Sequence, residues 1–305
     1  MKAVATIADG IKDKDPRAIA RAISMVEDGA PEAADLLALL DDFLFENAVV
    51  LGITGPPGAG KSTLTNQLIS SCRNQSRRVG IIAIDPSSPI SGGALLGDRI
   101  RMMQHAMDTD VVVRSMATRG RLGGLCAAAG AAARIMAASG CSPIFIETVG
   151  VGQSEMDIIR LADITALVLA PGLGDDVQAM KAGLQEVADL LVVNKADCSG
   201  AEALALDLET VTRGGGNSPT PVCMTTASDG SGVDELLSII EKIHEEHQQS
   251  GVRQSRRQKS RHLEILDWTI ELLRPVLMEK IQALDERKPV DPRTIAKNLL
   301  GKIFP

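Results

Sequence analysis

A glycine-rich segment with one lysine and one serine is the part of this sequence whose residue types and spacing most clearly suggest chemistry. Residues 55–62 read Gly-Pro-Pro-Gly-Ala-Gly-Lys-Ser and match the pattern G-x-x-x-x-G-K-[ST]. Glycines let the backbone curl its N–H groups around a phosphate, the lysine ammonium reaches phosphate oxygens, and the serine hydroxyl is a ligand for Mg²⁺. We therefore expect a nucleoside triphosphate to be bound by Gly55, Pro56, Pro57, Gly58, Ala59, Gly60, Lys61, Ser62 and Thr63.

A second polar motif indicates which base the nucleotide carries. Residues 194–197 read Asn-Lys-Ala-Asp and directly follow a short apolar run. An aspartate there can accept hydrogen bonds from both N1–H and the N2 amino group of guanine, whereas adenine offers no such pair. GTP is therefore predicted in preference to ATP, with the asparagine bracing the phosphate loop. The residues expected to contact the guanosine, including two after the next strand, are Asn194, Lys195, Asp197, Thr226 and Ala227.

Acidic residues between these motifs are candidates for metal binding and water activation. Asp85 and Glu147 each directly follow a short apolar run. Because the carboxyl ends of parallel strands open onto one crevice, both carboxylates are expected to hold Mg²⁺ or orient the attacking water, with Lys61 as the third catalytic residue. Asp98 is a further magnesium candidate beside Ser62, and the backbone N–H of Gly150 is placed to contact the γ-phosphate. The alternative for the acids is to cap a helix or brace a loop.

The alternation of apolar runs and helix-forming segments predicts an α/β fold. From Ala48 onward, short apolar runs bounded by glycine, aspartate or proline alternate with longer segments of helix formers, which is typical of a mostly parallel sheet flanked by helices. With the phosphate loop, this is the architecture of a P-loop NTPase. The expected strands are Val49–Thr54, Val79–Ile84, Val111–Arg114, Pro143–Ile146, Ile164–Ala170, Leu190–Val193 and Pro221–Met224.

Helical segments are expected on both sides of this sheet domain. Before it, two amphipathic patterns predict helices Pro16–Glu27 and Pro31–Phe45. After it, a basic run beginning at Arg253, expected to be a solvated helix face, leads into a long helix whose apolar stripe must be buried against the domain or against a second copy of the chain. The predicted domains are an N-terminal helical extension (1–46), a P-loop GTPase domain (47–248) and a C-terminal helical dimerisation arm (249–305).

Composition excludes several classes of protein. The 305 residues are 45% hydrophobic and 23% charged with a net charge of -7, which indicates a globular chain and neither a disordered nor a collagen-like one. The mild acidity argues against extensive nucleic-acid binding. No apolar run approaches the ~20 residues of a membrane span, and acids near the N-terminus interrupt anything like a targeting peptide. We expect a cytoplasmic protein that binds neither nucleic acid nor membranes.

The cysteines and histidines form no metal-binding pattern. The five cysteines stand singly, without a C-x-x-C pair, and are expected to be reduced core thiols. His244 and His247 are three residues apart with glutamates between them, which favours an exposed helix end over a metal site.

Several further motifs accompany the two nucleotide motifs in a fixed order. They are Asp85-Pro-Ser-Ser-Pro, Gly92-Gly93, Leu96-Gly97-Asp98, Arg119-Gly120, Leu122-Gly123-Gly124 and Glu147-Thr-Val-Gly-Val-Gly-Gln-Ser-Glu155. The complete set resembles the methylmalonyl-CoA mutase-associated GTPases, the MeaB/ArgK-type family of P-loop GTPases. The resemblance is densest from about Val49 to Asp197.

The resemblance implies a homodimeric GTPase that serves another enzyme. Members of the family bind an adenosylcobalamin-dependent acyl-CoA mutase such as methylmalonyl-CoA mutase, gate its cofactor loading, and protect or reactivate it. By resemblance, Asp85, Asp98 and Glu147 take magnesium and hydrolytic roles. The segment after the fifth strand looks like an additional switch towards the mutase, carried by Gly172, Asp175, Gln178 and Lys181; the alternative is a simple turn into a helix.

Hydrolysis is expected to be slow, because no arginine is clearly committed as a finger within the chain. Two other functions remain as alternatives. A nickel-insertion GTPase shares the fold class but usually carries a cysteine pair or a histidine-rich tract, and a kinase linked to amino-acid transport needs a base directed at an acceptor. Neither feature is evident in the sequence.

Overall fold

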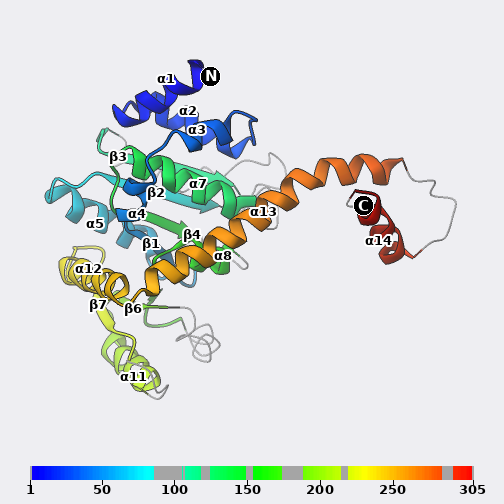
Figure 1. The fold of residues 1–305 in the computed structure, drawn as a ribbon. Coiled ribbons are helices and arrows are strands. Elements are labelled where there is room, and N and C mark those ends of the chain that lie inside the picture. The colour runs from blue at the N-terminus through cyan, green and yellow to red at the C-terminus, as the bar shows by residue number, and fades with distance from the viewer. Residues whose placement is uncertain are drawn as a thin grey trace.

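Seven parallel strands form one sheet at the centre of the molecule (Figure 1). The computed structural model describes residues 2–85, 105, 107–117, 124–148, 154–173, 188–213, 219–283 and 291–303. The sheet order is β3-β2-β4-β1-β5-β6-β7. The expected α/β class and all seven expected strands are confirmed, with bounds β1 Val50–Thr54, β2 Val79–Asp85, β3 Val111–Ala117, β4 Ile144–Thr148, β5 Ile164–Leu169, β6 Leu190–Asn194 and β7 Val222–Thr225.

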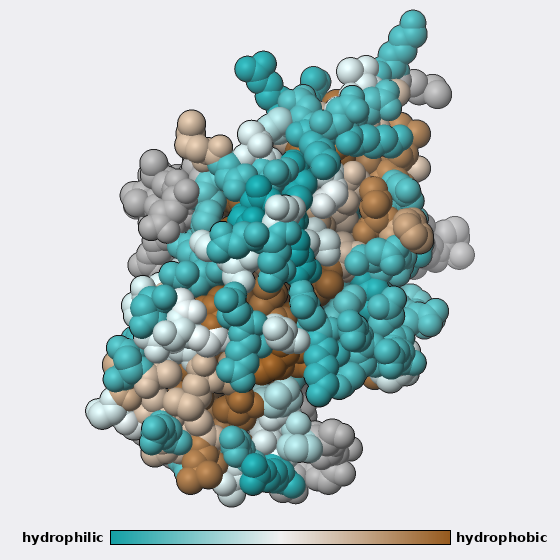
Figure 2. Space-filling model, turned by 90° about the vertical axis from the view of Figure 1, so that its left-hand side faces the viewer, coloured by the Kyte–Doolittle hydropathy of each residue, from teal (hydrophilic) through white to brown (hydrophobic). Residues whose placement is uncertain are grey.

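The central strands are apolar throughout because helices cover both faces of the sheet. Every residue of β1, β4, β5 and β6 is buried, which is why these strands appear in the sequence as continuous apolar runs without alternation. Helices α5 (Lys61–Asn74) and α12 (Val233–Gln249) pack on one face. Helices α7 (Gly124–Ala138), α8 (Ser154–Leu161) and α11 (Ala201–Arg213) pack on the other. The side of the molecule with α5 and α12 is mostly hydrophilic, and its apolar surface is broken into separate areas (Figure 2).

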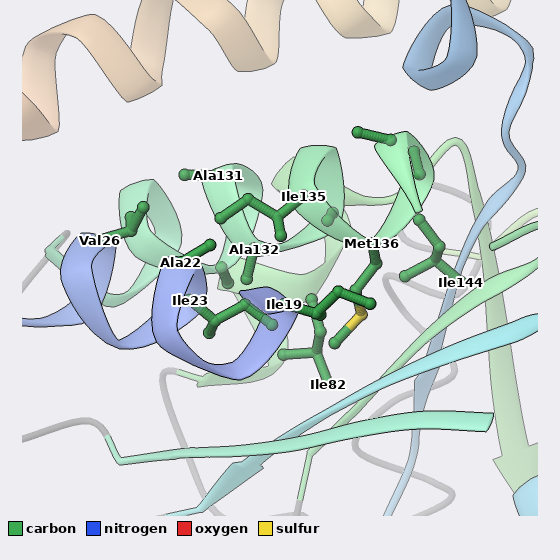
Figure 3. Packing of buried hydrophobic residues seen from close by; sticks show 14 of the residues in the cluster. Ile19, Ala22, Ile23, Val26, Ile82, Ala131, Ala132, Ile135, Met136 and Ile144 are labelled. Carbon is green, nitrogen blue, oxygen red and sulfur yellow. The ribbon is translucent and has the colours of Figure 1, made fainter. Parts of the chain in front are cut away.

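The N-terminal helices add a further layer outside α7. They are α1 (Lys2–Lys12), α2 (Pro16–Glu27), α3 (Ala33–Ala38) and α4 (Asp42–Asn47). In Figure 3, Ile19 and Ile23 of α2 point towards Ala132 and Ile135 of α7, and Ile82 of β2 closes the cluster from the sheet side. The N-terminal segment therefore extends the core that supports β2 and β4.

Two features of the N-terminal segment differ from expectation. The single helix predicted over Pro31–Phe45 is wrong, because the segment forms the short helices α3 and α4. The side chain of Asp41 accepts a hydrogen bond from the backbone N–H of Phe43 at 2.9 Å and starts α4 as an N-cap. Helix α1 was not predicted, although its buried residues Val4, Ile7, Ala8 and Ile11 have helical spacing.

The C-terminal arm begins with an arginine–aspartate cluster at the amino ends of the strands. Helix α13 (Val252–Gln282) carries Arg256 and Arg257 in its second turn. Arg257 bonds both carboxylate oxygens of Asp163 at 2.7 Å, and Arg256 bonds both of Asp189 at 2.7 Å. The same carboxylates accept the backbone N–H groups of Val50 and Thr165. The prediction of a solvated basic face is therefore wrong for the first arginines of the run, which fix α13 to the edge of the sheet opposite the phosphate loop. It is confirmed for Lys259 and Arg261, which are exposed.

Further along, α13 contacts the domain through charged residues and Trp268, and it exposes other apolar residues to solvent. Glu264 pairs with Arg134 of α7 at 2.5 Å, and Asp267 is buried. Burial raises the pKa of the Glu264 carboxyl, partly offset by Arg134. By contrast, Ile265, Leu266 and Ile270 are between 44% and 57% exposed. The apolar stripe expected from the sequence is thus not covered by the chain's own domain at Leu266 and Ile270.

We expect Asp163→Asn to destabilise the fold by about 3–5 kcal/mol, because buried Arg253 and half-buried Arg257 lose their counter-charge. The Asp163 side chain is 3% exposed, and it faces both Arg257 and Arg253, which is 3.5 Å away. Glu209→Gln is the matched control, since its pair with Arg213 is on the surface, and we expect a loss below about 1 kcal/mol. Urea denaturation measures both, and equal losses would contradict the assigned role of Asp163.

The two histidines of α12 lie against the arginine–aspartate cluster. Both are half-buried, so the prediction of an exposed helix end is wrong for them, and Nε2 of His247 is 3.7 Å from a carboxylate oxygen of Asp189. Within the part of the chain that the structure describes, no group of three or more His, Cys, Asp or Glu residues is placed to hold a metal ion. The prediction of core cysteines is confirmed for Cys72, Cys141 and Cys223 but wrong for Cys198, which is exposed.

Acidification is expected to destabilise the fold partly through His244. Burial, and then the charge of Arg253, lower the pKa of His244. The unfolded chain therefore takes up this proton first, so the free energy of unfolding falls as the pH drops below about 6.5. His244→Gln should lose less stability than the unmodified chain between pH 7.5 and pH 5.5, whereas exposed His262→Gln should follow the unmodified chain. If the free energy of unfolding of His244→Gln falls with pH as steeply as that of the unmodified chain, the pH dependence does not come from His244.

None of the helices described here is long and apolar enough to cross a membrane.

Candidate nucleotide-binding site

The phosphate loop joins the end of β1 to the start of α5, as the sequence pattern predicts. The loop ends at Gly60, and Lys61 is the first residue of α5. The Lys61 ammonium is buried and donates hydrogen bonds to the backbone carbonyls of Gly55 at 2.7 Å and Pro56 at 3.0 Å. These bonds hold the ammonium inside the loop, while the first N–H groups of α5 have no partner within the helix and point towards the same space. The loop therefore combines a fixed cation with a helix N-terminus, which suits a phosphate group.

Two glycines of the loop are required by close contacts as well as by backbone angles. At Gly55, with φ +141°, a Cβ atom would lie 2.1 Å from the carbonyl oxygen of Val168 in β5. At Gly60, with φ +90°, a Cβ atom would lie 2.4 Å from the side-chain nitrogen of Asn194. The loop can therefore lie this close to β5 and β6 only because both positions lack a side chain.

Gly55→Ala is expected to destabilise the fold by about 2–4 kcal/mol, from backbone strain and from the collision with β5. It should also weaken nucleotide binding, because the carbonyl of Gly55 helps to position Lys61. Gly58→Ala is the control: its φ is +80°, but nothing lies within 4 Å of the added Cβ, so only the conformational cost of about 1–2 kcal/mol applies. Thermal denaturation compares the two, and a Gly58→Ala loss as large as that of Gly55→Ala would contradict the contact argument.

Ser62 and Glu147 meet directly, although 85 residues separate them. The Ser62 hydroxyl donates a hydrogen bond to the Glu147 carboxylate, which is 5% exposed. Glu147 lies on β4, paired in register with Ile53 of β1 and Ala83 of β2. This hydroxyl and carboxylate form an all-oxygen donor set of the kind that Mg²⁺ prefers. Asp85 ends β2, the strand next to β4, so its backbone lies at the same edge of the sheet.

Asn194 connects the phosphate loop to the two strands on the other side. Its side-chain N–H group donates to the carbonyl of Ala59 at 2.9 Å, and its carbonyl accepts from the backbone N–H of Ala227 at 3.1 Å and from the hydroxyl of Thr225 at 3.2 Å. The expected bracing contact is therefore present. Thr225 was not among the residues expected to contact the guanosine, and its hydroxyl meets Asn194 because the two residues pair in register on β7 and β6.

The remaining residues of the guanine motif line the same edge of the sheet. Lys195 has φ +58° and is exposed, and Asp197 is exposed two residues further on. Between them, the N–H of Ala196 donates to the carbonyl of Thr225 at 3.0 Å, which fixes this turn to the end of β7. Thr226 and Ala227 follow β7 and are buried. The backbone of the turn is therefore fixed to β7, while the side chains of Lys195 and Asp197 remain exposed.

Several expected site residues lie outside the described residues. They are Asp98, Gly150, Asp175, Gln178 and Lys181, together with the side chain of Asp85. Gly172 is described: it has φ +85° and is exposed in the turn after β5. The structure therefore places the first residue of the expected partner switch at the carboxyl edge of the sheet, the same edge as the phosphate loop.

Comparison with protein families gives a match over most of the chain. Residues 19–284 match the family model described as "Methylmalonyl Co-A mutase-associated GTPase MeaB". A Pyrococcus abyssi protein provisionally named as a GTPase is 45% identical over 313 residues, covering 96% of this chain and 95% of its own length. The mouse mitochondrial methylmalonic aciduria type A homolog is 32% identical over 263 residues, covering 84% of this chain and 62% of its own.

Solved structures agree with this fold. A crystal structure titled as a LAO/AO transport system kinase matches with a TM-score of 0.70 and 23% identity, over 99% of this chain and 98% of that one. At this identity the match supports the P-loop fold with its N-terminal and C-terminal helices, and it says nothing of substrate.

Proposed function

We propose that this chain, which belongs to the methylmalonyl-CoA mutase-associated GTPase family, is a slow GTPase that gates cofactor loading of an adenosylcobalamin-dependent acyl-CoA mutase and protects or reactivates it. The observation that carries the nucleotide part is the connected geometry of Lys61, Asn194 and Glu147 around one loop. Asn194 belongs to the guanine motif and bonds the phosphate loop. It therefore fixes the proposed phosphate site relative to the proposed guanine site, as one bound nucleotide requires.

The proposed chemistry divides between the loop and the acids. Lys61 and the loop amides bind the β- and γ-phosphates, and Asp197 binds guanine. Ser62 and Glu147, with Asp85 and Asp98, would hold Mg²⁺, which neutralises charge on the β- and γ-phosphate oxygens when bound. Glu147 and Asp85 are also the proposed groups that orient the attacking water. A slow intrinsic rate is proposed because no arginine is clearly committed as a finger by the sequence motifs.

The proposed partner and assembly follow from family membership and from the arm. A mouse relative is named for methylmalonic aciduria type A, which supports a mutase-related role. The uncovered apolar face of α13 supports a homodimer. The proposed division into extension, P-loop domain and arm remains at residues 1–46, 47–248 and 249–305, and the proposed location is the cytoplasm, where free thiols such as Cys72, Cys141 and Cys223 persist.

The test is nucleotide-dependent capture of a mutase. The tagged full-length chain, loaded with a non-hydrolysable GTP analogue or with GDP, is incubated with a purified adenosylcobalamin-dependent acyl-CoA mutase and analysed by sedimentation. We expect complex formation that differs between the two nucleotides, and transfer of adenosylcobalamin to the mutase that depends on GTP. Identical behaviour with both nucleotides would contradict gating. Transfer of the γ-phosphoryl to protein, without phosphate release, would favour a kinase.

A further inference from the structure

Two buried threonine hydroxyls lie at the carboxyl ends of neighbouring strands, beside the phosphate loop. Thr54 is the last residue of β1 and directly precedes Gly55, and Thr148 is the last residue of β4 and directly follows Glu147. The two threonines are 2% and 0% exposed. Neither hydroxyl has a hydrogen-bond partner among the residues that the structure describes. A buried hydroxyl without a partner is costly, so two of them at one site require an explanation.

Both threonine side chains lie on the face of the sheet that α7 and α8 cover. Successive side chains of a strand point to opposite faces. In β4, Ile146 packs in the cluster beneath α7, so Thr148, two residues further on, lies on the same face. In β1, a Cβ atom at Gly52 would lie 2.3 Å from the side chain of Ile158 in α8, so Thr54 also lies on this face.

The two hydroxyls are at adjacent positions of one parallel ladder. Ile53 pairs in register with Glu147, and the threonines are the next residues of the two strands. Neighbouring strands lie about 4.8 Å apart, which is close to twice the length of about 2.8 Å of one O–H···O hydrogen bond. A single water molecule between the hydroxyls can therefore bond both of them, and buried polar groups are commonly satisfied in this way.

We propose that Thr54 and Thr148 are positioning residues of the nucleotide site and share one buried water, which joins the end of β4 to the strand that leads into the phosphate loop. The side chain of Glu147 points to the opposite face, where it accepts the Ser62 hydroxyl. The shared water fixes the backbone beside Glu147, and so holds its carboxylate where Mg²⁺ is proposed to bind. This inference rests on the proposed function and deepens it, because neither threonine touches the nucleotide itself.

Replacement of each threonine by valine tests the shared water, since valine keeps the shape and removes the hydroxyl. We expect Thr54→Val and Thr148→Val each to lower kcat for GTP hydrolysis about 10- to 100-fold and to raise the Mg²⁺ concentration that gives half the maximal rate. GDP affinity measured in EDTA should not change. Thr148→Ser, which keeps the hydroxyl, should keep the rate of the unmodified chain.

Thermal denaturation provides the opposite result if the hydroxyls are only buried and hold nothing. Valine then removes an unsatisfied polar group, so the denaturation midpoint of Thr148→Val would rise by about 2 °C with hydrolysis unchanged. That outcome overturns the inference. Thr212→Val is the control: Thr212 is 2% exposed on α11 and its hydroxyl donates to the carbonyl of Glu209 at 3.1 Å, so this variant should lose stability and keep its hydrolysis rate.

The double variant distinguishes one shared water from two separate sites. If one water bonds both hydroxyls, removal of either hydroxyl breaks the connection. Thr54→Val combined with Thr148→Val should therefore lose no more activity than the more affected single variant. Losses that multiply in the double variant would contradict the shared water.

High-resolution crystallography of the full chain gives a readout that does not depend on activity. We expect an ordered water within about 3 Å of both hydroxyls in the unmodified chain, and none at this place in Thr148→Val. A chain that hydrolyses GTP without such a water overturns the inference alone. A chain that holds the water but does not hydrolyse GTP contradicts the proposed function and supports the assigned water.

Discussion

Lys61→Ala is expected to abolish tight nucleotide binding. The ammonium is buried, and the carbonyls of Gly55 and Pro56 hold it at 2.7 and 3.0 Å, so little side-chain entropy remains to be lost when it meets a phosphate. Hydrogen bonds to charged groups contribute about 1.5–3 kcal/mol each. Loss of two such bonds, about 3–6 kcal/mol in all, corresponds to a roughly 100- to 20,000-fold weaker affinity.

A fluorescent GTP analogue measures this loss by titration. Lys242→Ala is the control, because this lysine of α12 is 77% exposed and its pair with Glu246 is a long one at the surface. The affinity of this variant for GTP should equal that of the unmodified chain. Circular dichroism checks that Lys61→Ala is folded. A folded Lys61→Ala chain that binds GTP normally would show that the loop does not hold the phosphates.

Asp197→Asn is expected to change the preferred base from guanine to xanthine. The carboxylate can accept from both N1–H and the N2 amino group of guanine, whereas an amide presents a donor that matches the O2 carbonyl of xanthine. A site built around a hydrogen-bonded group discriminates strongly when that group is mismatched, so GTP affinity should fall by about 100-fold or more. Because Asn194 holds the turn independently of Asp197, the phosphate loop should stay intact.

Displacement of the bound fluorescent analogue by GTP or by XTP measures which base the variant prefers. The control is Glu202→Gln, an exposed acid in the first turn of α11 a few residues away, which should leave the preference for GTP unchanged. Retention of GTP preference in Asp197→Asn would place guanine recognition elsewhere. Loss of binding to both GTP and XTP would indicate that the substitution disturbs the phosphate loop as well as the base site.

The fold was predictable where local sequence decides it. The strands β1, β4, β5 and β6 are buried on both faces and appear as apolar runs, and the phosphate loop follows the first of them. The errors have two causes. The break before α4 is local, because Asp41 caps this helix by accepting the backbone N–H of Phe43, two residues further on. The burial of the first arginines of α13 is tertiary, because it depends on Asp163 and Asp189 lying against them.

The candidate site was predictable to a similar extent. Motif spacing identified the loop, and the strand-end rule placed Glu147 at the correct edge, where it meets Ser62. The supporting contacts were not predictable, because they depend on which strands are neighbours. The carbonyl of Val168 limits position 55 to glycine only because β5 lies beside β1, and Thr225 supports Asn194 only because β7 pairs with β6.

Calorimetric titration of the full chain with GTP and Mg²⁺ tests the central claim most directly. We predict saturable binding at one site per chain, at least about 100-fold tighter for GTP than for ATP because adenine lacks the donor pair that Asp197 requires. Binding should weaken when EDTA removes the metal. Absence of binding to a folded chain, or equal affinity for GTP and ATP, would contradict the account.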